Sequence, residues 1–376
     1  MKVLVVAHYF QPHTGGIEVV AQNQARYLSK AGHRVQILTS AVEKQPAGIE
    51  KHPDGYTIYR VRASNILERK LGVPFPVFSP SIFMRSYKLI KSADVVHVHD
   101  AFYISSLVTT LFARIYNKPV ILTQHVAMIP HPKKSINVIQ RIVYATTGSF
   151  IFHASAKIII LNSRVRNFLL DKGVAEGKII FLPNGVDTKQ FHPASEKEKS
   201  LLRKKYKLSN DRVLALFVGR FVPKKGFTKL LQMKPITNLT VVFAGGYAPL
   251  QHKQHNHHFL GPVTREDIAD VFRMCDIFVL PSEGEGFPLT VQEAMACGLT
   301  IVTTNDPAYA LYNLDPDHIY FVSPNIAEFR RVLEEISIHP EKRRATHKYV
   351  RNYAVSHFNW SAYVDSVTKL YEEVTA

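Results

Sequence analysis

Short apolar segments alternate with amphipathic segments along most of this chain. Residues 2–10 are largely apolar, and between residues 17 and 28 the apolar side chains recur at helical spacing. Gly16 and Gly32 flank this predicted helix, as helix boundaries require. Further apolar segments follow at residues 33–40, 94–100, 118–126 and 157–163. Nearly continuous apolar strands separated by helices predict a parallel β-sheet covered by helices on both faces.

The alternation stops at residues 183–210, which are turn-rich and then highly charged, and a second series follows. Its expected strands are 212–220, 239–247, 275–282 and 299–305, and its expected helices are 265–274, 288–298 and 327–336. An amphipathic helix is expected at about 359–374. A chain of 376 residues is long for one hydrophobic core. We therefore expect an N-terminal α/β domain at 1–195, a second α/β domain at 196–356 and a C-terminal helix within 357–376.

Composition describes a globular protein, because 46% of the residues are apolar and 20% are charged. No apolar run approaches the ~18 residues of a membrane-spanning helix. The first apolar run leads into a sequence without a small-residue cleavage site, so it predicts a strand rather than a signal peptide. Two cysteines, Cys275 and Cys297, form no disulfide framework, which fits a reducing cytoplasm.

The net charge of +17 is unevenly distributed, with +14 in residues 1–195 and +3 in residues 196–376. A basic half suggests an anionic partner, either nucleic acid or an acidic membrane surface, although solubility alone can account for it. Neither interleaved aromatic residues nor a recognition helix is visible, so we do not expect nucleic-acid binding.

Residues at the carboxyl ends of the predicted strands are the first candidates for a binding site. Gly15 and Gly16 open a predicted helix, where backbone N–H groups suit an anion, although the dinucleotide pattern GxGxxG is absent. Arg220 ends a strand of the second series, and Lys224 and Lys225 follow it. These cations can hold a diphosphate and stabilise its charge as it leaves, and the alternative is a solvated basic loop.

The segment PSEGEGFPLTVQEAMACG, residues 281–298, places carboxylates around a helix start. Pro288 fits the first helical position and Gly298 the residue after the helix end. Glu285 is then expected in the loop before the helix, and Glu293 about two turns into it. One carboxylate can bind sugar hydroxyls and the other ribose hydroxyls. The backbone N–H groups of Phe287, Leu289 and Thr290 can bind phosphate oxygens, and Glu283 is expected at the rim.

This segment resembles the Glu-x7-Glu motif of glycosyltransferase family 4, whose members are retaining enzymes of the GT-B fold. The similarity extends in order over nearly the whole chain, through GGIEVVAQNQARYLSKAGHRV, DVVHVHD, KPVILTQHV, FLPNGVD, FVGRFVPKKG and HFNWSAYVDSVTKLY. The resemblance implies two Rossmann-like parallel-sheet domains facing across a cleft, with a C-terminal helix that crosses back to the first domain.

The resemblance also implies roles for individual residues. The catalytic residues would be His125, Glu285, Arg220 and Lys225. The donor-binding residues would be Gly15, Gly16, Arg220, Lys225, Glu285, Gly286, Phe287, Pro288, Leu289, Thr290 and Glu293. His125 would face the reacting sugar, and Glu293 would bind the ribose.

The chain departs from the family pattern in several places. Pro288 replaces a common glycine, the stretch from Gly226 to Phe243 leaves little room for the usual helix, and residues 305–313 lack a common Gly-Gly. The loop 244–259, where the base is expected, is unusual, so the sequence does not indicate UDP, GDP or ADP.

Two patterns could be mistaken for metal sites. Four histidines, His252, His255, His257 and His258, lie in an expected polar loop without carboxylate or thiolate neighbours. Asp315 and Asp317 form an Asp-x-Asp pattern with an intervening proline, which favours a turn. We expect no metal site and no cofactor.

The expected activity is transfer of a hexose-type sugar, with retention of configuration, from a nucleotide-diphosphate sugar to a hydroxyl acceptor. Alternatives are a GT-B nucleotide-sugar epimerase or phosphorylase, or a basic nucleic-acid-binding protein. Arg60, Arg62, Arg69 and Lys70 lie close to the apolar run 71–84, which predicts contact with an anionic bilayer. We therefore expect a cytoplasmic enzyme peripheral to the inner membrane face, acting on a lipid-linked acceptor or a cell-surface glycan.

Overall fold

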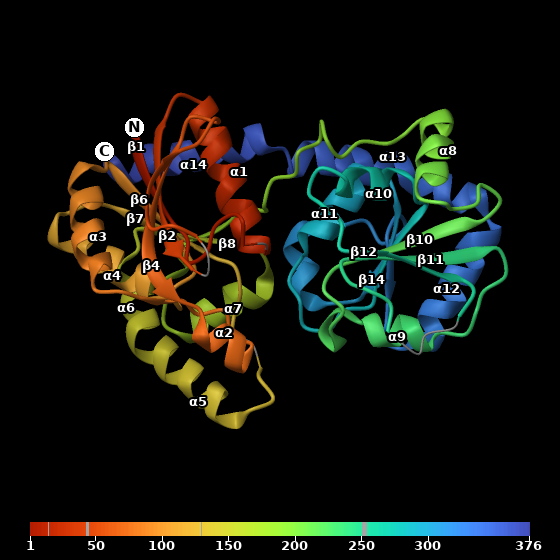
Figure 1. Cartoon of the computed structure of the whole chain (residues 1–376), viewed down its shortest axis with the longest axis horizontal. Helices are drawn as coiled ribbons and strands as arrows, with labels where there is room; N and C mark the ends of the chain where they lie inside the picture. The colour runs from red at the N-terminus through yellow and green to blue at the C-terminus, as the bar shows by residue number, and fades with distance from the viewer. Residues whose placement is uncertain (14, 43–44, 129, 250–253) are drawn as a thin grey trace. The chain divides into compact units, whose positions relative to one another are not determined.

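The computed structural model describes residues 1–13, 15–42, 45–128, 130–249 and 254–376. The chain divides into two compact units (Figure 1). Unit 1 comprises Met1–Gly185 and Trp360–Ala376, and unit 2 comprises Val186–Asn359. Among the helices of these described ranges, none is long and apolar enough to cross a bilayer.

Unit 1 is built on a largely parallel sheet in the order β3-β4-β2-β1-β6-β7-β8-β9, with β3 and the short β5 pairing antiparallel to β4. Its strands are β1 (Lys2–Val6), β2 (Arg34–Ala41), β3 (Gly48–Lys51), β4 (Thr57–Ser64), β5 (Val77–Phe78), β6 (Val95–His99), β7 (Val120–Gln124), β8 (Lys157–Ile160) and β9 (Ile179–Phe181). The central strands β6 and β7 are buried throughout, because helices cover both faces of the sheet (Figure 1).

The helices of unit 1 connect these strands. They are α1 (Gly16–Lys30), α2 (Ile66–Leu71), α3 (Ser81–Ser92), α4 (Ile104–Ile115), α5 (Lys134–Val143), the π-helix η1 (Tyr144–Gly148), α6 (Ser149–Ala154), α7 (Ser163–Asp171), the 3-10 helix η2 (Glu176–Lys178) and α14 (Trp360–Thr375). The order of the parallel strands reverses between β1 and β6. Ligands of such sheets bind where the order reverses, beyond the carboxyl ends of the strands.

The C-terminal helix α14 packs on α1 within unit 1. Trp360 is fully buried and stacks on Tyr27 at a centroid distance of 5.7 Å, and His33 hydrogen-bonds to Thr368 at 3.1 Å. Gly185 lies directly against the indole: a Cβ there would be 2.3 Å from Cδ2 of Trp360. Only glycine fits at this close approach.

Unit 2 is built on a fully parallel sheet in the order β12-β11-β10-β13-β14-β15. Its strands are β10 (Val213–Val218), β11 (Leu239–Ala244), β12 (His257–Gly261), β13 (Ile277–Leu280), β14 (Thr300–Thr304) and β15 (Tyr320–Val322). Its helices are α8 (Glu196–Lys205), η3 (Pro223–Lys225), α9 (Phe227–Gln232), α10 (Ile268–Arg273), α11 (Leu289–Ala296), η4 (Pro307–Tyr312), α12 (Ile326–Ile338) and α13 (Pro340–His357). The strand order reverses between β10 and β13.

The boundaries of the two units differ from the expected 195/196 and 356/357. Residues 186–195 belong to unit 2 because Arg351 of α13 donates to the carbonyls of Thr188 and Phe191, at 3.2 and 2.9 Å. Phe358 also belongs to unit 2, where its carbonyl accepts from the N–H of Val186 at 2.6 Å. These contacts join segments far apart in sequence, so local composition does not reveal them.

Three local expectations differ from the structure. The charged segment within 183–210 contains helix α8, which begins at a complete capping box between Ser195 and Glu198. The apolar run 71–84 is not a surface segment throughout, because Phe78 and Ile82 are buried. His257 begins strand β12 rather than lying in a polar loop.

Candidate functional site

Two of the predicted donor-binding side chains meet at the point in unit 2 where the strand order reverses. Nζ of Lys225, in the loop after β10, lies 2.5 Å from Oε2 of Glu285, in the loop after β13. Their side chains are 18% and 15% exposed, so the ion pair is accessible but largely shielded from water. A cation and a carboxylate held together at this position can bind a polar ligand with both charge and hydroxyl groups.

A glycine allows the two loops to approach each other. Gly226 has φ of +77°, and a Cβ at this position would lie 2.2 Å from the carbonyl oxygen of Pro281. Glu283 reinforces the contact, since its N–H donates to the carbonyl of Lys224 at 3.0 Å. The loop that carries Lys225 is therefore held against the loop that carries Glu285 by backbone contacts.

Helix α11 begins one residue later than expected. Pro288 is its N-cap rather than its first residue, and Gly298, with φ of +74°, follows its end as predicted. Glu293 is the fifth residue of the helix, so it lies about one turn from the start rather than the expected two. This shorter separation brings Glu293 closer to the free N–H groups of the first turn.

Glu293 differs from Glu285 in its environment. Burial raises the pKa of the Glu293 carboxyl to about 8, although the charge of Arg265 acts in the opposite direction. A largely protonated carboxyl at neutral pH can donate a hydrogen bond as well as accept one. The two glutamates of the motif therefore offer different chemistry to a ligand.

The other predicted residues around the α11 start fall into two groups. The side chain of Phe287 is buried and packs on Tyr309 and Tyr312, at centroid distances of 5.1 and 4.1 Å, so only its backbone can face a ligand. Gly286, Leu289 and Thr290 are partly exposed at or before the first turn. The N–H groups of the first helical residues have no partner within the helix and can bind an anion.

The remaining residues of the predicted site in unit 2 lie on its surface. Arg220 is exposed just after β10. Glu283, expected at the rim, is 61% exposed and forms an ion pair with Lys229.

In unit 1, His125 lies at the end of a buried hydrogen-bonded chain. Its Nε2 is 2.9 Å from Nδ1 of His99, whose Nε2 is 2.8 Å from Oε1 of Gln24. An amide oxygen only accepts, so Nε2 of His99 carries the hydrogen and its Nδ1 accepts from Nε2 of His125. The chain continues from Nε2 of Gln24 to Nδ1 of His97, at 3.0 Å, and to the hydroxyl of Tyr371, at 3.3 Å.

Burial keeps these histidines neutral. Desolvation lowers the pKa of His125 to about 3 and that of His97 to about 3, with a further lowering of His97 by His125. Desolvation also lowers the pKa of His99 well below its usual value. His125 can therefore donate one hydrogen bond and accept another at neutral pH, but it does not carry a positive charge.

Asp100 is a site residue that sequence reasoning did not select. It follows β6 and accepts from the N–H of His125 at 2.8 Å, while its second oxygen, Oδ2, is buried without a hydrogen-bond partner. Burial raises its pKa to about 7. The signal was the acidic residue that ends the strand DVVHVHD, at the same edge of the sheet as His125.

The predicted anion site at Gly15 and Gly16 already contains a carboxylate. The buried side chain of Glu18 folds back, so that a Cβ at Gly15 would lie 2.4 Å from Glu18 Oε2. His13 Nδ1 is 2.8 Å from Glu18 Oε1, and this hydrogen bond raises the pKa of His13. Glu18 thus provides the negative charge that the start of α1 favours.

The predicted basic surface near α2 is only partly a surface. Arg60 is buried, donating to the carbonyl of Gln11 at 2.7 Å and to the Glu50 carboxylate at 3.2 Å. It forms the floor of a hollow of about 1000 Å³ at the carboxyl ends of β1 and β4. Arg62, Arg69 and Lys70 are exposed, as expected.

The two patterns resembling metal sites differ in outcome. His252 lies outside the described residues. Within the described ranges, no group of three or more His, Cys, Asp or Glu side chains is arranged to hold a metal ion. Asp315 lies before a turn, as its proline predicted, and its carboxylate accepts from the N–H of Asp317 at 3.0 Å and pairs with His318 at 2.9 Å.

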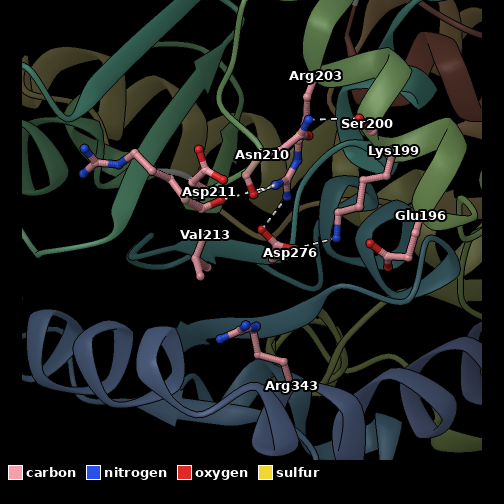
Figure 2. Close-up of a pocket in the computed structure, with 10 residues that line it drawn as sticks. Glu196, Lys199, Ser200, Arg203, Asn210, Asp211, Val213, Asp276 and Arg343 are labelled. Atoms are coloured by element: carbon pink, nitrogen blue, oxygen red, sulfur yellow. Dashed lines mark hydrogen bonds and ion pairs between the residues drawn. The ribbon is translucent and has the colours of Figure 1, made fainter.

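A second hollow in unit 2, of about 510 Å³, lies at the opposite, amino ends of β10 and β13 (Figure 2). Asp276 is its central charge and forms ion pairs with Lys199 at 2.5 Å and Arg203 at 2.7 Å. Burial opposes ionisation of Asp276, but the charges of Lys199 and Arg203 hold its pKa below the usual value. This network anchors α8 to the sheet and is separate from the Lys225–Glu285 pair.

Comparison with known proteins decides the family. The family model described as Glycosyltransferase Family 4 matches residues 14–190, and the model described as Glycosyl transferases group 1 matches residues 198–353. The chain belongs to glycosyltransferase family 4. Within this family it is 25% identical over 356 residues to a phosphatidylinositol N-acetylglucosaminyltransferase subunit from Arabidopsis thaliana, covering 90% of this chain and 75% of that protein.

Solved structures place this family 4 glycosyltransferase in the GT-B fold. Sucrose-phosphate synthase from Thermosynechococcus elongatus aligns with a TM-score of 0.78 and 18% identity, covering 99% of this chain and 98% of that one. Anabaena Alr3699/HepE, in a complex with UDP-glucose, aligns with a TM-score of 0.73 and 16% identity, covering 99% and 100%. The α/β fold with two parallel-sheet domains, expected from sequence, is therefore confirmed.

Proposed function

We propose that this glycosyltransferase moves a hexose-type sugar from a nucleotide-diphosphate sugar to a hydroxyl group of a lipid-linked acceptor, with retention of configuration. The observation that carries the proposal is the Lys225–Glu285 ion pair, which lies where the strand order of unit 2 reverses and next to the start of α11. A diphosphate and a sugar are the ligand groups that match a cation, a carboxylate and free helix N–H groups at one position.

In this proposal the donor interacts with unit 2 as follows. Lys225 and Arg220 bind the diphosphate, together with the first N–H groups of α11. Glu285 binds sugar hydroxyls, and Glu293 binds the ribose. As the bond between C1 and the diphosphate oxygen breaks, these cations stabilise the departing charge.

The acceptor hydroxyl attacks C1 on the face that the diphosphate leaves. Its proton passes to an oxygen of the departing diphosphate, so neither a metal ion nor a second carboxylate is needed. His125 contributes a neutral hydrogen-bonding group to the sugar. Retention, metal independence and a role in cell-envelope polysaccharide synthesis are parts of the proposal that need direct tests.

A lipid-linked acceptor is supported by two observations. The Arabidopsis relative is, by its name, part of an enzyme that acts on phosphatidylinositol. The hollow of about 1000 Å³ in unit 1 is lined by hydrogen-bonding side chains, including Gln11, Glu50 and Asn65, that suit a hydroxyl-rich head group. A peripheral position at the cytoplasmic face of an anionic membrane follows from such an acceptor.

A donor screen tests the proposal directly. Unfolding temperatures are measured with UDP-, GDP- and ADP-sugars, and the product of the best donor with phosphatidylinositol or polyprenyl-diphosphate glycans is analysed by NMR. We expect one nucleotide series to stabilise the protein, a product with the donor's anomeric configuration, and no effect of EDTA. An inverted product, activity restored by Mn²⁺ after EDTA treatment, or isomerised free nucleotide-sugar would each contradict the corresponding part.

A further inference from the structure

Helix α5 of unit 1 presents large aliphatic side chains to solvent. Val138, Ile139 and Ile142 are 50%, 55% and 57% exposed, whereas Ile136 is the buried residue of this helix. Positions i, i+1 and i+4 lie on one side of a helix, so the three side chains form a continuous stripe. Exposed aliphatic residues gathered in one place mark an interaction surface.

Positive charge borders this stripe. Lys133, Lys134 and Arg141 are exposed at the start and on the flank of the helix. Residues 101–170 contain eight Lys and Arg and no Asp or Glu, so no acidic side chain of this long segment offsets the charge. An apolar stripe flanked by cations is typical of helices that lie in the interface of an anionic bilayer.

The position of α5 relates the stripe to the active-site edge of the sheet. The segment between β7 and α5 begins with His125, so the helix starts from the carboxyl end of a central strand. Figure 1 shows α5 extending away from the sheet of unit 1. A surface in contact with α5 would therefore lie on the side of unit 1 where His125 is found.

We propose that α5 is the membrane-contacting helix of this enzyme, with an anionic phospholipid bilayer as its partner. Val138, Ile139 and Ile142 enter the interface between head groups and acyl chains, and Lys133, Lys134 and Arg141 lie against lipid phosphates. The inference rests on the proposed lipid-linked acceptor and names the surface that brings the protein to it. Few aliphatic residues bind weakly on their own, so stable binding requires the cations as well.

A second copy of the chain fits this surface less well. Two α5 helices paired about a twofold axis would place Lys134 and Arg141 of each copy near the same cations of the other, with no acidic residue of residues 101–170 to offset them. An anionic bilayer supplies the complementary charge that a second copy lacks.

Flotation with liposomes tests the apolar stripe. The wild-type protein and the variant Ile139→Asp/Ile142→Asp are mixed with vesicles of phosphatidylcholine alone or enriched in phosphatidylglycerol. We expect the wild type to float with the anionic vesicles at low salt, and the variant to lose about tenfold or more in bound fraction. The matched control is Ile115→Asp, at the far end of α4 in the same unit, where the side chain is 59% exposed, and it should float like the wild type.

A charge series tests the cations. The variant Lys133→Gln/Lys134→Gln/Arg141→Gln should bind anionic vesicles about tenfold or more less tightly at low salt and lose most of its salt dependence. The control Lys204→Gln/Lys234→Gln/Lys348→Gln removes the same charge from exposed positions of unit 2 and should retain binding. All variants should keep the wild-type unfolding temperature and its shift on adding nucleotide.

The outcomes separate this inference from the proposed function. Equal flotation of the α5 variants and the wild type, or loss of binding in the Ile115 variant alone, would overturn the α5 assignment while leaving donor binding intact. A change from dimer to monomer in sedimentation, without any effect on vesicle binding, would identify a second copy as the partner and overturn it too. Vesicle binding as expected in a protein that binds no nucleotide-sugar would instead refute the proposed function.

Discussion

The ammonium group of Lys225 lies 2.5 Å from the carboxylate of Glu285, although 60 positions separate them in the chain. Each was predicted to bind a different part of a donor, and in this structure they neutralise each other. A diphosphate that binds Lys225 must share or replace this ion pair, which would release Glu285 toward the sugar. The pair thus links recognition of the two parts of the donor.

Removing either member of this pair should abolish most of the transfer activity. We expect Lys225→Met to lower the rate by about 100-fold, the scale for losing one preorganised charge-stabilising group, and Glu285→Gln to lower it at least as much. Arg220→Ala should also cost on the order of 100-fold. Steady-state kinetics with saturating donor measure these losses, and near wild-type activity in the Glu285 variant would refute the site.

The same pair should show energetic coupling in a stability cycle. Unfolding by urea of Lys225→Met, Glu285→Gln and the double variant should give a coupling of about 0.5–1 kcal/mol, at the low end for contacting residues because both side chains are partly exposed. The Lys229–Glu283 pair of the same loops is a matched control. Glu283 is 61% exposed, so its coupling should be smaller.

The raised pKa of Glu293 predicts pH-dependent stability. Because folding raises this pKa to about 8 from a usual value of 4.5, the folded state holds a proton that the unfolded state has lost. Stability from this group is therefore complete below about pH 4.5 and is lost as the pH rises to 8. Glu293→Gln should remove this loss, so its urea midpoint relative to wild type should be higher at pH 9 than at pH 5.

Glu293 should also couple nucleotide binding to pH. If the ionised carboxylate binds the ribose hydroxyls, affinity for the nucleotide should increase with pH, by up to about tenfold per pH unit below pH 8. Calorimetry of the wild type and Glu293→Gln across pH 6–9 measures this, with the exposed Glu266→Gln as the control. A wild-type affinity independent of pH would show that Glu293 does not bind the nucleotide as a carboxylate.

The hydrogen-bonded chain in unit 1 predicts that Gln24 positions His125 without touching substrate. Gln24→Leu removes the acceptor for Nε2 of His99 and so frees both histidines to change tautomer. We expect kcat to fall by about 10- to 100-fold with little change in nucleotide affinity, the range for losing a group that orients a functional histidine. Nitrogen-15 NMR should report loss of the Nε2–H form of His125.

A control separates this positioning effect from a general loss of structure. Gln36 is another partly buried amide of unit 1, and it donates to the hydroxyl of Tyr59 at 3.0 Å. Gln36→Leu should keep the wild-type kcat and the His125 tautomer. Unchanged kcat and NMR signals in a folded Gln24→Leu protein would contradict the role of Gln24.

The contact between Gly185 and Trp360 predicts strong selectivity for glycine. Gly185→Ala would place a Cβ within 2.3 Å of the buried indole, so the C-terminal helix must shift. We expect a loss of about 1–3 kcal/mol in unfolding free energy, the usual cost of overpacking. Gly177→Ala is the matched control because a Cβ there meets nothing within 4 Å, and equal stability of the two variants would contradict the prediction.

The strand positions and the residues beyond them could be predicted because their signals are local. Apolar runs marked β1, β6, β10 and β13, and the rule that ligands bind beyond strand ends selected Lys225 and Glu285. Helix α8 was missed although its capping box, Ser195 and Glu198, is also local, because the high charge of the segment hid a short helix. Asp100 was missed because its burial and its bond to His125 depend on the neighbouring strand.

Local periodicity and glycine or proline punctuation, which act over a few residues, were enough to determine the two parallel sheets and the residues at their carboxyl edges. Packing between distant segments decided the rest. It paired Lys225 with Glu285, raised the pKa of Glu293, buried Arg60 and left the stripe of α5 exposed. Burial and electrostatics are properties of the space around a side chain, and only the tertiary structure establishes which segments fill that space.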